Sequence, residues 1–251
     1  MAIFAIDVGN RRVKLGLVTG EDEIVHRLHF LSENLADNAE SLEKLARDQK
    51  VEGIAISSVV PQMTDALRGI LMGYRPLIVT GETPGPLEVR YDDKSKLGAD
   101  RLAAAAGAYH IYGKILKRTI MVVDAGSAVT IDLVDREGSF LGGAILPGES
   151  ISHRCLGKMI SQLPEAEYEA VDSPYGTNTL DCMRAGVRAS VVGAIEHLYK
   201  RFGDKLAESP FMLITGASAS WIAPELSIPH MVDPDIVLVG LKAIWSHNNQ
   251  E

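Results

Sequence analysis

Two aspartates, Asp7 and Asp124, occupy matching places in the sequence, each at the end of an apolar run and two residues before a glycine. The first run reads IFAIDVGNRRVKLGLV over residues 3–18, and the second reads MVVDAGSAVTIDLV over residues 121–134. Each pattern predicts a β-hairpin with a carboxylate at its tip. Such a carboxylate can face a metal ion, while backbone N–H groups of the glycine-containing turn bind a phosphate. For either pattern alone, an ordinary hairpin without a ligand is the alternative.

The second pattern falls near the middle of the 251 residues and repeats the order of residue types in the first, with Ser127 in the place of Asn10. This repetition indicates a duplicated domain. Two such domains that face each other across a cleft could hold a nucleotide phosphate chain between their hairpins. The arrangement resembles the actin-like ATPase and sugar-kinase superfamily. We therefore expect an α/β fold of two ribonuclease H-like domains, residues 1–115 and 116–251, with a cleft between them.

The elements around the first hairpin follow from hydrophobic periodicity. Residues 24–31 predict a third strand, residues 35–50 have apolar side chains close to helical spacing, and residues 51–60 predict a buried strand. Pro61 starts a helix that should end near residue 72. This β-β-β-α-β-α order fits one ribonuclease H-like half. In the second half we expect helices over residues 151–163, 180–202 and 236–245 and a strand over residues 211–216.

Composition limits the classes of partner. The net charge of −8 and the sequence pI near 5.4 argue against a general nucleic-acid or membrane-surface role, because such partners require clustered Lys and Arg. Cys155 and Cys182 stand outside any metal-ligand spacing, so reduced thiols are expected. No run approaches the roughly 18 apolar residues of a membrane span, and no basic leader precedes the first strand. We expect a cytoplasmic protein that binds neither nucleic acid nor membrane.

A third carboxylate, Asp100, lies in the sequence LGADR at residues 97–101, where an alanine-rich helix begins. A helix with so little side-chain bulk is expected to pack closely against another element. Asp100 could act on a substrate, or it could simply cap the helix, which is the commonest role of Asp at such a position.

The sequence GTNT at residues 176–179 precedes the long helix of the second half. Its hydroxyl and amide side chains suit helix capping, which needs no ligand. Further along this helix, Gly186 and Gly193 are seven residues apart on one face. That face could contact another helix at close range and so serve a dimer.

Seven short sequences occur in an order that spans nearly the whole chain. They are DVGN at 7–10, SSVVP at 57–61, LGADR at 97–101, DAGSAVTID at 124–132, GGAILPG at 142–148, GTNT at 176–179 and DPDIVLVGL at 233–241. Any one of them is a weak signal, but the ordered set resembles the type III pantothenate kinase family.

The resemblance implies an ATP-dependent kinase that phosphorylates pantothenate to 4'-phosphopantothenate, the first step of coenzyme A biosynthesis. It also implies a homodimer that uses Mg2+ and a monovalent cation, K+ or NH4+. The residues that the resemblance assigns to ATP are Asp7, Val8, Gly9, Asn10, Arg11, Arg12, Val13, Lys14 and Ser127. Those that it assigns to pantothenate are Tyr91, Gly98, Ala99, Asp100, Arg101 and Thr179, the last acting from the partner subunit. Asp100 is the implied catalytic proton acceptor, Asp7 the implied Mg2+ ligand and Asp124 the implied monovalent-cation ligand.

Three residues depart from the family pattern. Arg11 stands where the family usually has Thr or Ser, Ala217 stands where a second Gly usually follows Thr-Gly, and Lys94 replaces a common Pro. Arg11 and Ala217 both belong to the expected ATP site. The alternative hypothesis is a catalytically weakened member of the family that acts as a regulatory or accessory binding protein. A sugar or acetate-type kinase of the same superfamily would be longer and would leave the GADR and GTNT motifs unexplained.

Overall fold

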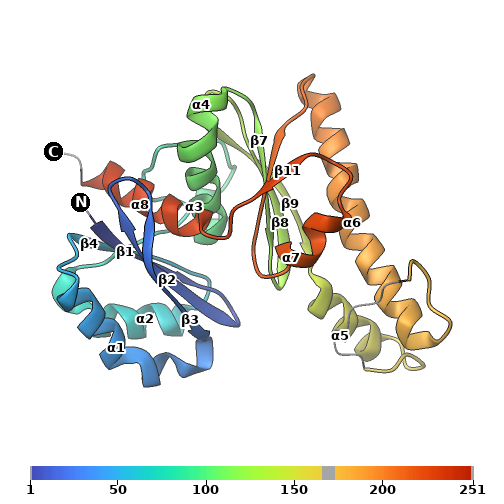
Figure 1. The fold of residues 1–251 in the computed structure, drawn as a ribbon, viewed down its shortest axis with the longest axis horizontal. Helices are drawn as coiled ribbons and strands as arrows, with labels where there is room; N and C mark the ends of the chain where they lie inside the picture. The colour runs from blue at the N-terminus through green and yellow to red at the C-terminus, as the bar shows by residue number, and fades with distance from the viewer. Residues whose placement is uncertain (1, 166–172, 250–251) are drawn as a thin grey trace. The chain divides into compact units, whose positions relative to one another are not determined.

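The computed structural model describes residues 2–165 and 173–249, and the chain divides into two compact units (Figure 1). Unit 1 comprises residues 1–118, 133–142 and 235–251, and unit 2 comprises residues 119–132 and 143–234. The sequence predicts contiguous domains, 1–115 and 116–251, whereas unit 1 also contains residues 116–118, 133–142 and 235–251. The larger difference arises because the C-terminal helix, α8 (Ile236–Asn248), packs on elements of the first half of the chain.

Unit 1 is built on a five-stranded sheet with the strand order β3-β2-β1-β4-β5. The strands are β1 (Ala2–Val8), β2 (Arg12–Thr19), β3 (Ile24–Leu31), β4 (Gly53–Ser58) and β5 (Leu77–Ile78). The central strand β1 runs antiparallel to β2 and parallel to β4. The predicted hairpin, third strand and buried parallel strand are therefore all present.

Helices cover both faces of this sheet (Figure 1). On one face, α1 (Leu35–Asp48) and α2 (Pro61–Ile70) enclose a core with Phe4, Ile6 and Val8 of β1. On the other face lies α8, because a Cβ added to Gly53 of β4 would collide with a ring of that helix. Successive side chains of a strand point to opposite faces. Asp7, which alternates with the three core residues, therefore faces the α8 side.

The alanine-rich helix α3 (Ala99–Ala108) packs closely on α8, as its composition predicts. A Cβ on Gly107 of α3 would collide with the carbonyl oxygen of Ile236, and one on Gly240 of α8 would collide with that of Ala103. Only glycine at these two crossing points allows the backbones to approach so closely. After α3 the chain continues as a π-helical turn, Tyr109–Gly113.

An ionic contact ties α8 to the turn between β2 and β3. Lys242 of α8 is 7% exposed, and its Nζ donates to Asp22 Oδ1 at 2.5 Å. The other carboxylate oxygen, Oδ2, lies 2.9 Å from His110 Nε2. Burial raises the pKa of Asp22, but the hydrogen bonds and charges of Lys242 and His110 outweigh it and hold the pKa below its ordinary value. The last helix is thus fastened to the N-terminal hairpin by charge as well as by packing.

The second sheet has the strand order β11-β10-β7-β8-β9-β6. Its strands are β7 (Ile120–Ala125), β8 (Ala128–Val134), β9 (Ser139–Pro147), β10 (Phe211–Thr215), β11 (His230–Val232) and β6 (Glu88–Val89). β10 runs parallel to both β7 and β11, and β6 pairs with the start of β9. The predicted repeat hairpin is β7–β8, and the predicted strand at residues 211–216 is β10.

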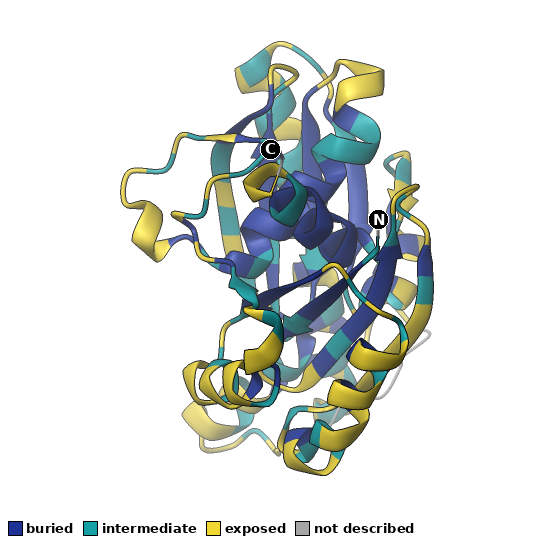
Figure 2. Ribbon diagram, turned by 90° about the vertical axis from the view of Figure 1, so that its left-hand side faces the viewer, coloured by how far each residue is buried: buried dark blue, intermediate teal, exposed yellow. Residues whose placement is uncertain are grey.

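The helices of unit 2 are α5 (Glu149–Met159), α6 (Thr179–Leu206) and the short α7 (Ala219–Ile222). α5 ends before the predicted residue 163 because Ile160 takes an extended backbone. α6 runs past the predicted residue 202, and its C-cap, Ala207, is left-handed. Figure 2 shows buried residues, in dark blue, along the strands, and exposed residues on the outer turns of helices. No helix in the described ranges has the length and apolar character of a membrane span.

Candidate active site

The β1–β2 hairpin brings a carboxylate and an ammonium group together. Residues 9–11 form its turn, which the Gly9 N–H closes by donating to the Arg12 carbonyl oxygen at 2.9 Å. Asp7 pairs directly opposite Lys14 in the ladder, so both side chains lie on the α8 side of the sheet. Both residues are half-buried. The pair therefore offers a carboxylate oxygen for a cation and an ammonium group for a phosphate at the base of an exposed turn.

The remaining hairpin residues divide into two groups. Asn10, Arg11 and Arg12 are exposed at the tip. Val8 and Val13 are buried in the core on the α1 and α2 side, so only their backbone groups could serve a ligand. The predicted ATP residues of this hairpin are thus held in one local structure, but not all of them can act through side chains.

Ser57 adds a partner that the sequence analysis did not assign. It is the next-to-last residue of β4 and lies beside Asp7 in the parallel register, and its hydroxyl donates to Asp7 Oδ1 at 2.5 Å. Ser57 is fully buried, so the bond is shielded from water. The only signal in the sequence was the position of Ser57 in the SSVVP motif, at the end of a strand that pairs with the Asp7 strand.

Asp100 lies in the first turn of α3, but it is not the residue that caps this helix. The N-cap is Gly98, and the helix begins at Ala99, which is buried. The Asp100 Oδ1 accepts a hydrogen bond from the backbone N–H of Arg101 at 2.8 Å. Gly98 is thus the N-cap, while the Asp100 carboxylate binds one of the free backbone N–H groups of the first turn, so the structure leaves both the capping and the catalytic interpretation of Asp100 open. Its carboxylate is half-buried in the helix N-terminal turn, where the helix dipole favours negative charge.

Arg101 lies against two aromatic rings within unit 1. Its guanidinium carbon is 5.7 Å from the ring centroid of Tyr91 and 5.8 Å from that of Phe140. The two rings are 6.2 Å apart and inclined at 57°. Arg101 is only 6% exposed, which is unusual for an arginine. Two of the residues predicted for pantothenate thus meet at an aromatic cluster, which also contains Phe140, a residue that the sequence analysis did not single out.

In unit 2, Asp124 lies near the end of β7, and Ser127 lies in the turn before β8. The Ser127 carbonyl oxygen accepts from the Gly148 N–H at 2.9 Å, which joins this turn to the end of the GGAILPG motif. Thr215 of β10 pairs with Asp124 in parallel register. The Thr215 hydroxyl is fully buried and has no hydrogen-bond partner among the described residues. A carboxylate and an unsatisfied hydroxyl thus stand side by side on two strands.

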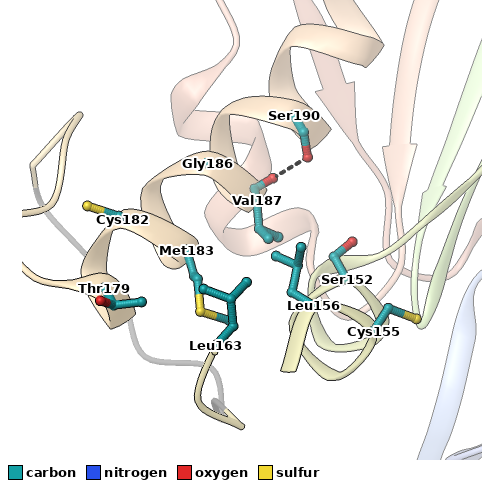
Figure 3. A pocket seen from close by; sticks show the side chains of 10 residues that line it. All are labelled: Ser152, Cys155, Leu156, Leu163, Thr179, Cys182, Met183, Gly186, Val187 and Ser190. Atoms are coloured by element: carbon teal, nitrogen blue, oxygen red, sulfur yellow. Dashed lines mark hydrogen bonds between the residues drawn. The ribbon is translucent and has the colours of Figure 1, made fainter. Parts of the chain in front are cut away.

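Thr179 begins α6 and is exposed. Asn178 caps the helix, since its Oδ1 accepts from the Asp181 N–H at 3.0 Å, so the capping interpretation of GTNT holds for Asn178. The Thr179 side chain instead lines a cavity of about 600 Å³ between α5 and α6 (Figure 3). The cavity is lined by Ser152, Cys155, Leu156, Leu163, Thr179, Cys182, Met183, Gly186, Val187 and Ser190. Most of these side chains are apolar or small.

A set of ionisable residues faces across the same pair of helices. Burial raises the pKa of Glu149 in α5 to about 7, against the attraction of Arg188 in α6. Burial, and secondarily the charge of Arg184, lowers the pKa of His153, whose ring nitrogens have no partner in residues 2–165 and 173–249. Arg188 donates to Glu225 at 2.9 Å. No motif in the sequence indicated these residues, because the contact joins two helices.

Comparison with known proteins identifies the family to which this chain belongs. A model of the family described as type III pantothenate kinase matches residues 3–201. A type III pantothenate kinase from Geobacillus sp. (strain WCH70) is 34% identical over 98% of each chain. Among solved structures, a Baf family protein from Campylobacter jejuni matches with a TM-score of 0.63 and 20% identity over 98% of each chain. An ROK hexokinase from Thermus thermophilus matches with a TM-score of 0.51 and 14% identity over 97% of this chain and 98% of that one. The structures show the fold of the actin-like ATPase and sugar-kinase superfamily.

Proposed function

The chain belongs to the type III pantothenate kinase family, and on that premise we propose which of its residues carry out the reaction. The enzyme transfers phosphate from ATP to pantothenate and forms 4'-phosphopantothenate, the first step of coenzyme A biosynthesis. The observation that carries the assignment is the meeting of three polar groups on one face of the unit 1 sheet. Asp7, Lys14 and Ser57 all point to the face that α8 covers, and α3, which holds Asp100, contacts both α8 and β4.

ATP phosphates are assigned to residues 7–14, with Ser127 as a further contact. Lys14 supplies a positive charge, and the turn at residues 9–11 supplies backbone donors. Asp7 suits Mg2+, because this ion is typically bound by one or two carboxylates together with substrate phosphates. Bound Mg2+ would neutralise phosphate charge during a transfer whose transition state is loose. Ser57 holds one oxygen of Asp7 and so fixes the direction of the other.

Asp100 is the proposed proton acceptor for the pantothenate hydroxyl. A carboxylate placed at that hydroxyl orients it and takes its proton as the bond to phosphorus forms. Arg101 follows in the same helical turn and offers a planar set of N–H donors to carboxylate or amide oxygens of pantothenate. Tyr91 contacts Arg101, and Gly98 and Ala99 shape the start of α3.

A monovalent cation, K+ or NH4+, is proposed at Asp124. The observation that supports it is the buried hydroxyl of Thr215, which is aligned with Asp124 and unsatisfied within the described part of the chain. Oxygen donors of this kind fit K+, which would supply positive charge beside anionic ligands. At equal ionic strength, activity should be higher in K+ than in Na+; equal rates in the two salts would remove this role.

A homodimer is proposed through α6, with Thr179 reaching the partner's pantothenate. Gly186 and Gly193 support it, since in the described chain no atom beyond the adjoining backbone of α6 itself lies within 4 Å of a Cβ built on either. Both are exposed, as is Thr179 at the rim of an apolar cavity. Sedimentation at micromolar concentration should give about twice the chain mass of 27.1 kDa. A fully active monomer would contradict the shared site.

Two of the three departures from the family pattern, Arg11 and Ala217, belong to the expected ATP site, and neither distorts the local backbone. Gly216 keeps a left-handed φ of +92°, and a side chain there would collide with Ala125 and Asp124. Ala217 is exposed, and its φ is not positive, so this position does not require glycine. Arg11 is exposed at the hairpin tip and does not crowd the core. These observations favour a working kinase over a weakened binding protein.

The deciding experiment is a coupled assay of ADP release with Mg2+ and K+, with and without pantothenate. Pantothenate-dependent ADP release is the expected result, and its absence would favour the regulatory alternative. We place the enzyme in the cytoplasm, where both cysteines, which form no disulfide in the described residues, would stay reduced. Cell fractionation tests that location, and recovery outside the soluble fraction would contradict it.

A further inference from the structure

We infer that the turn at residues 80–83 is a positioning element that holds the start of α3, and with it Asp100, in place for pantothenate. The inference rests on the proposed role of Asp100 and extends it to residues outside the seven motifs. Gly81 of this turn is buried and lies against the segment that precedes α3. A Cβ built on Gly81 would collide with the Lys94 carbonyl oxygen and lie 2.7 Å from the Leu97 carbonyl oxygen. Only glycine allows the two backbones to approach so closely.

The segment before α3 has little packing of its own. The five residues before Leu97 are all exposed, whereas Leu97 is buried. The short 3-10 helix in this segment, Lys94–Lys96, is capped by Asp93, whose carboxylate accepts from the Ser95 N–H at 3.1 Å. Such local bonds set the shape of the helix but do not fix its place relative to the sheet. That place is set by the burial of Leu97 together with the contact to Gly81.

The turn that carries Gly81 is attached to the sheet and braced internally. Just before it, the Val79 N–H donates to the Ile56 carbonyl oxygen of β4 at 2.8 Å. Within it, the Thr80 N–H donates to the Thr83 hydroxyl oxygen at 2.8 Å, and the Thr83 N–H donates to the Thr80 carbonyl oxygen at 3.1 Å. The turn is therefore a firm support, because a movement of Gly81 would disturb bonds on both sides of it.

A shift of the supported segment would reach Asp100 through tight contacts. Gly98 follows Leu97 directly, and a Cβ built on Gly98 would lie 2.5 Å from Asp100 Oδ1. The Leu102 N–H donates to the Gly98 carbonyl oxygen at 3.1 Å, which ties Gly98 to the first turn of α3. Little slack is left between the segment and the carboxylate. Since misplacing a reacting group by about 1 Å can cost 10²-fold in rate, the turn at residues 80–83 should affect the reaction.

The test compares Gly81→Ala with Gly85→Ala in the complete enzyme. The added methyl group of Gly81→Ala would push the backbone of residues 94–97 away, so kcat/KM for pantothenate should fall about 10- to 100-fold. The dissociation constant of ADP, measured by calorimetry without pantothenate, should stay within about twofold of wild type. Gly85 lies in the same loop, but in the described chain a Cβ built on it would meet only a side-chain atom of Ile244, at 3.4 Å. Gly85→Ala should therefore leave kcat/KM for pantothenate unchanged.

Leu42→Ala controls for a general loss of stability. Leu42 is fully buried in the core on the α1 and α2 side of the unit 1 sheet. Its truncation should lower the melting temperature, but kcat/KM for pantothenate should stay within about twofold of wild type at a temperature where every variant is folded. A loss in Leu42→Ala equal to that in Gly81→Ala would overturn the inference, because reduced stability would then explain both.

A further variant loosens the turn without adding a methyl group. Thr83→Ala removes the oxygen that accepts from the Thr80 N–H, so kcat/KM for pantothenate should fall about 2- to 10-fold, the equivalent of one hydrogen bond. Adding Lys94→Pro should recover most of this loss, because proline fixes φ at the first residue of the 3-10 helix. The position accepts proline, since Asp93 before it has an extended backbone, with φ −121° and ψ 96°. Thr83→Ala also replaces Gly81→Ala if the alanine variant does not fold.

The outcomes separate this inference from the proposed function. A wild-type enzyme without pantothenate-dependent turnover would refute the proposed function. An active wild type with unchanged kcat/KM in Gly81→Ala would refute only the inference. The inference would also fail if the affinity for ADP fell as much as kcat/KM for pantothenate, or if Lys94→Pro did not recover the loss in Thr83→Ala.

Discussion

Ser57 and Asp7 occupy adjacent positions on two parallel strands, and the serine hydroxyl donates to the aspartate across 2.5 Å. Because the serine is fully buried, Ser57→Ala would remove a bond to Asp7 that is shielded from water. We expect Ser57→Ala to raise the Mg2+ concentration for half-maximal activity by about tenfold or more, the usual effect of removing a partner of a metal ligand. Initial rates measured over a range of Mg2+ concentrations give this value.

The neighbouring serine provides the matched control for this variant. In the described residues, the Ser58 hydroxyl donates to the Val60 carbonyl oxygen and accepts from the Val60 N–H, and it makes no bond to Asp7. Ser58→Ala should therefore change stability slightly and leave the Mg2+ dependence unchanged. An equal shift in both variants would mean that Ser57 stabilises the sheet and does not orient Asp7.

Asp100→Asn should keep the fold and ATP binding but lower turnover by about two to four orders of magnitude, as expected when a positioned base is lost. The amide oxygen can still accept the Arg101 N–H, so the start of α3 should be preserved. Single-turnover kinetics with saturating ATP and pantothenate measure the rate of phosphoryl transfer. Asp93→Asn, which alters a carboxylate bonded to Ser95 in the preceding loop, is the control. Near-normal turnover in Asp100→Asn would show that Asp100 is not the proton acceptor.

Glu149 should make stability depend on pH in a defined direction. Burial raises the pKa of Glu149 from 4.5 to about 7. Between these two pH values the folded state therefore keeps a proton on Glu149 that the unfolded state releases. Its contribution is therefore fully present below pH 4.5 and is lost as pH rises towards 7. Glu149→Gln should unfold like wild type at pH 4.5 and be more stable at pH 8 by up to about 3 kcal/mol, at 1.36 kcal/mol per pKa unit.

Urea unfolding of both proteins at the two pH values measures this difference. Glu137→Gln serves as the control, because Glu137 is exposed and pairs only with the adjacent Arg136 in the ion pairs found for it. That variant should show no comparable dependence on pH. A stability gain in Glu149→Gln that is the same at both pH values would show that the charge of Glu149 is not the cause.

Arg11→Thr restores the residue type usual at this position. Since the arginine is exposed at the hairpin tip, the melting temperature should not change. An exposed guanidinium that contacts phosphate contributes modestly, so the KM for ATP should rise by at most about fivefold and turnover should change little. Steady-state kinetics with varied ATP test this. Inactivity of the wild type, with activity restored by Arg11→Thr combined with Ala217→Gly, would support the weakened-kinase alternative instead.

The features predictable from sequence were those encoded by local patterns. The hairpins at Asp7 and Asp124 and most helix and strand positions are confirmed because they depend on periodicity and turn residues within a short window. The two-residue strand β6 was not predicted, since only its pairing with β9 makes it a strand. The placement of α8 in unit 1 depends on glycine contacts across 133 residues of chain, from Gly107 to Gly240.

The site residues likewise divide into those with a local sequence pattern and those that depend on contacts between distant parts of the sequence. The motifs identified candidates such as Asp100 and Arg101, because their types suit the chemistry at those spacings. Ser57 bonds to Asp7, and Phe140 packs against Arg101, although the members of these pairs are 50 and 39 residues apart in the sequence, respectively. Such roles have no local signature. Whether the motif residues act as proposed stays a prediction for the experiments above.

The return of α8 to unit 1 has a consequence for the order in which the protein is made. Unit 1 begins with the first strand, but α8, which packs on one face of its sheet, is synthesised only after the residues of unit 2. At a synthesis rate of about 5–20 residues per second, translating residues 119–234 takes roughly 6 to 23 seconds, during which that face of the sheet lacks α8. Unit 1 can therefore finish folding only after most of unit 2 has been synthesised.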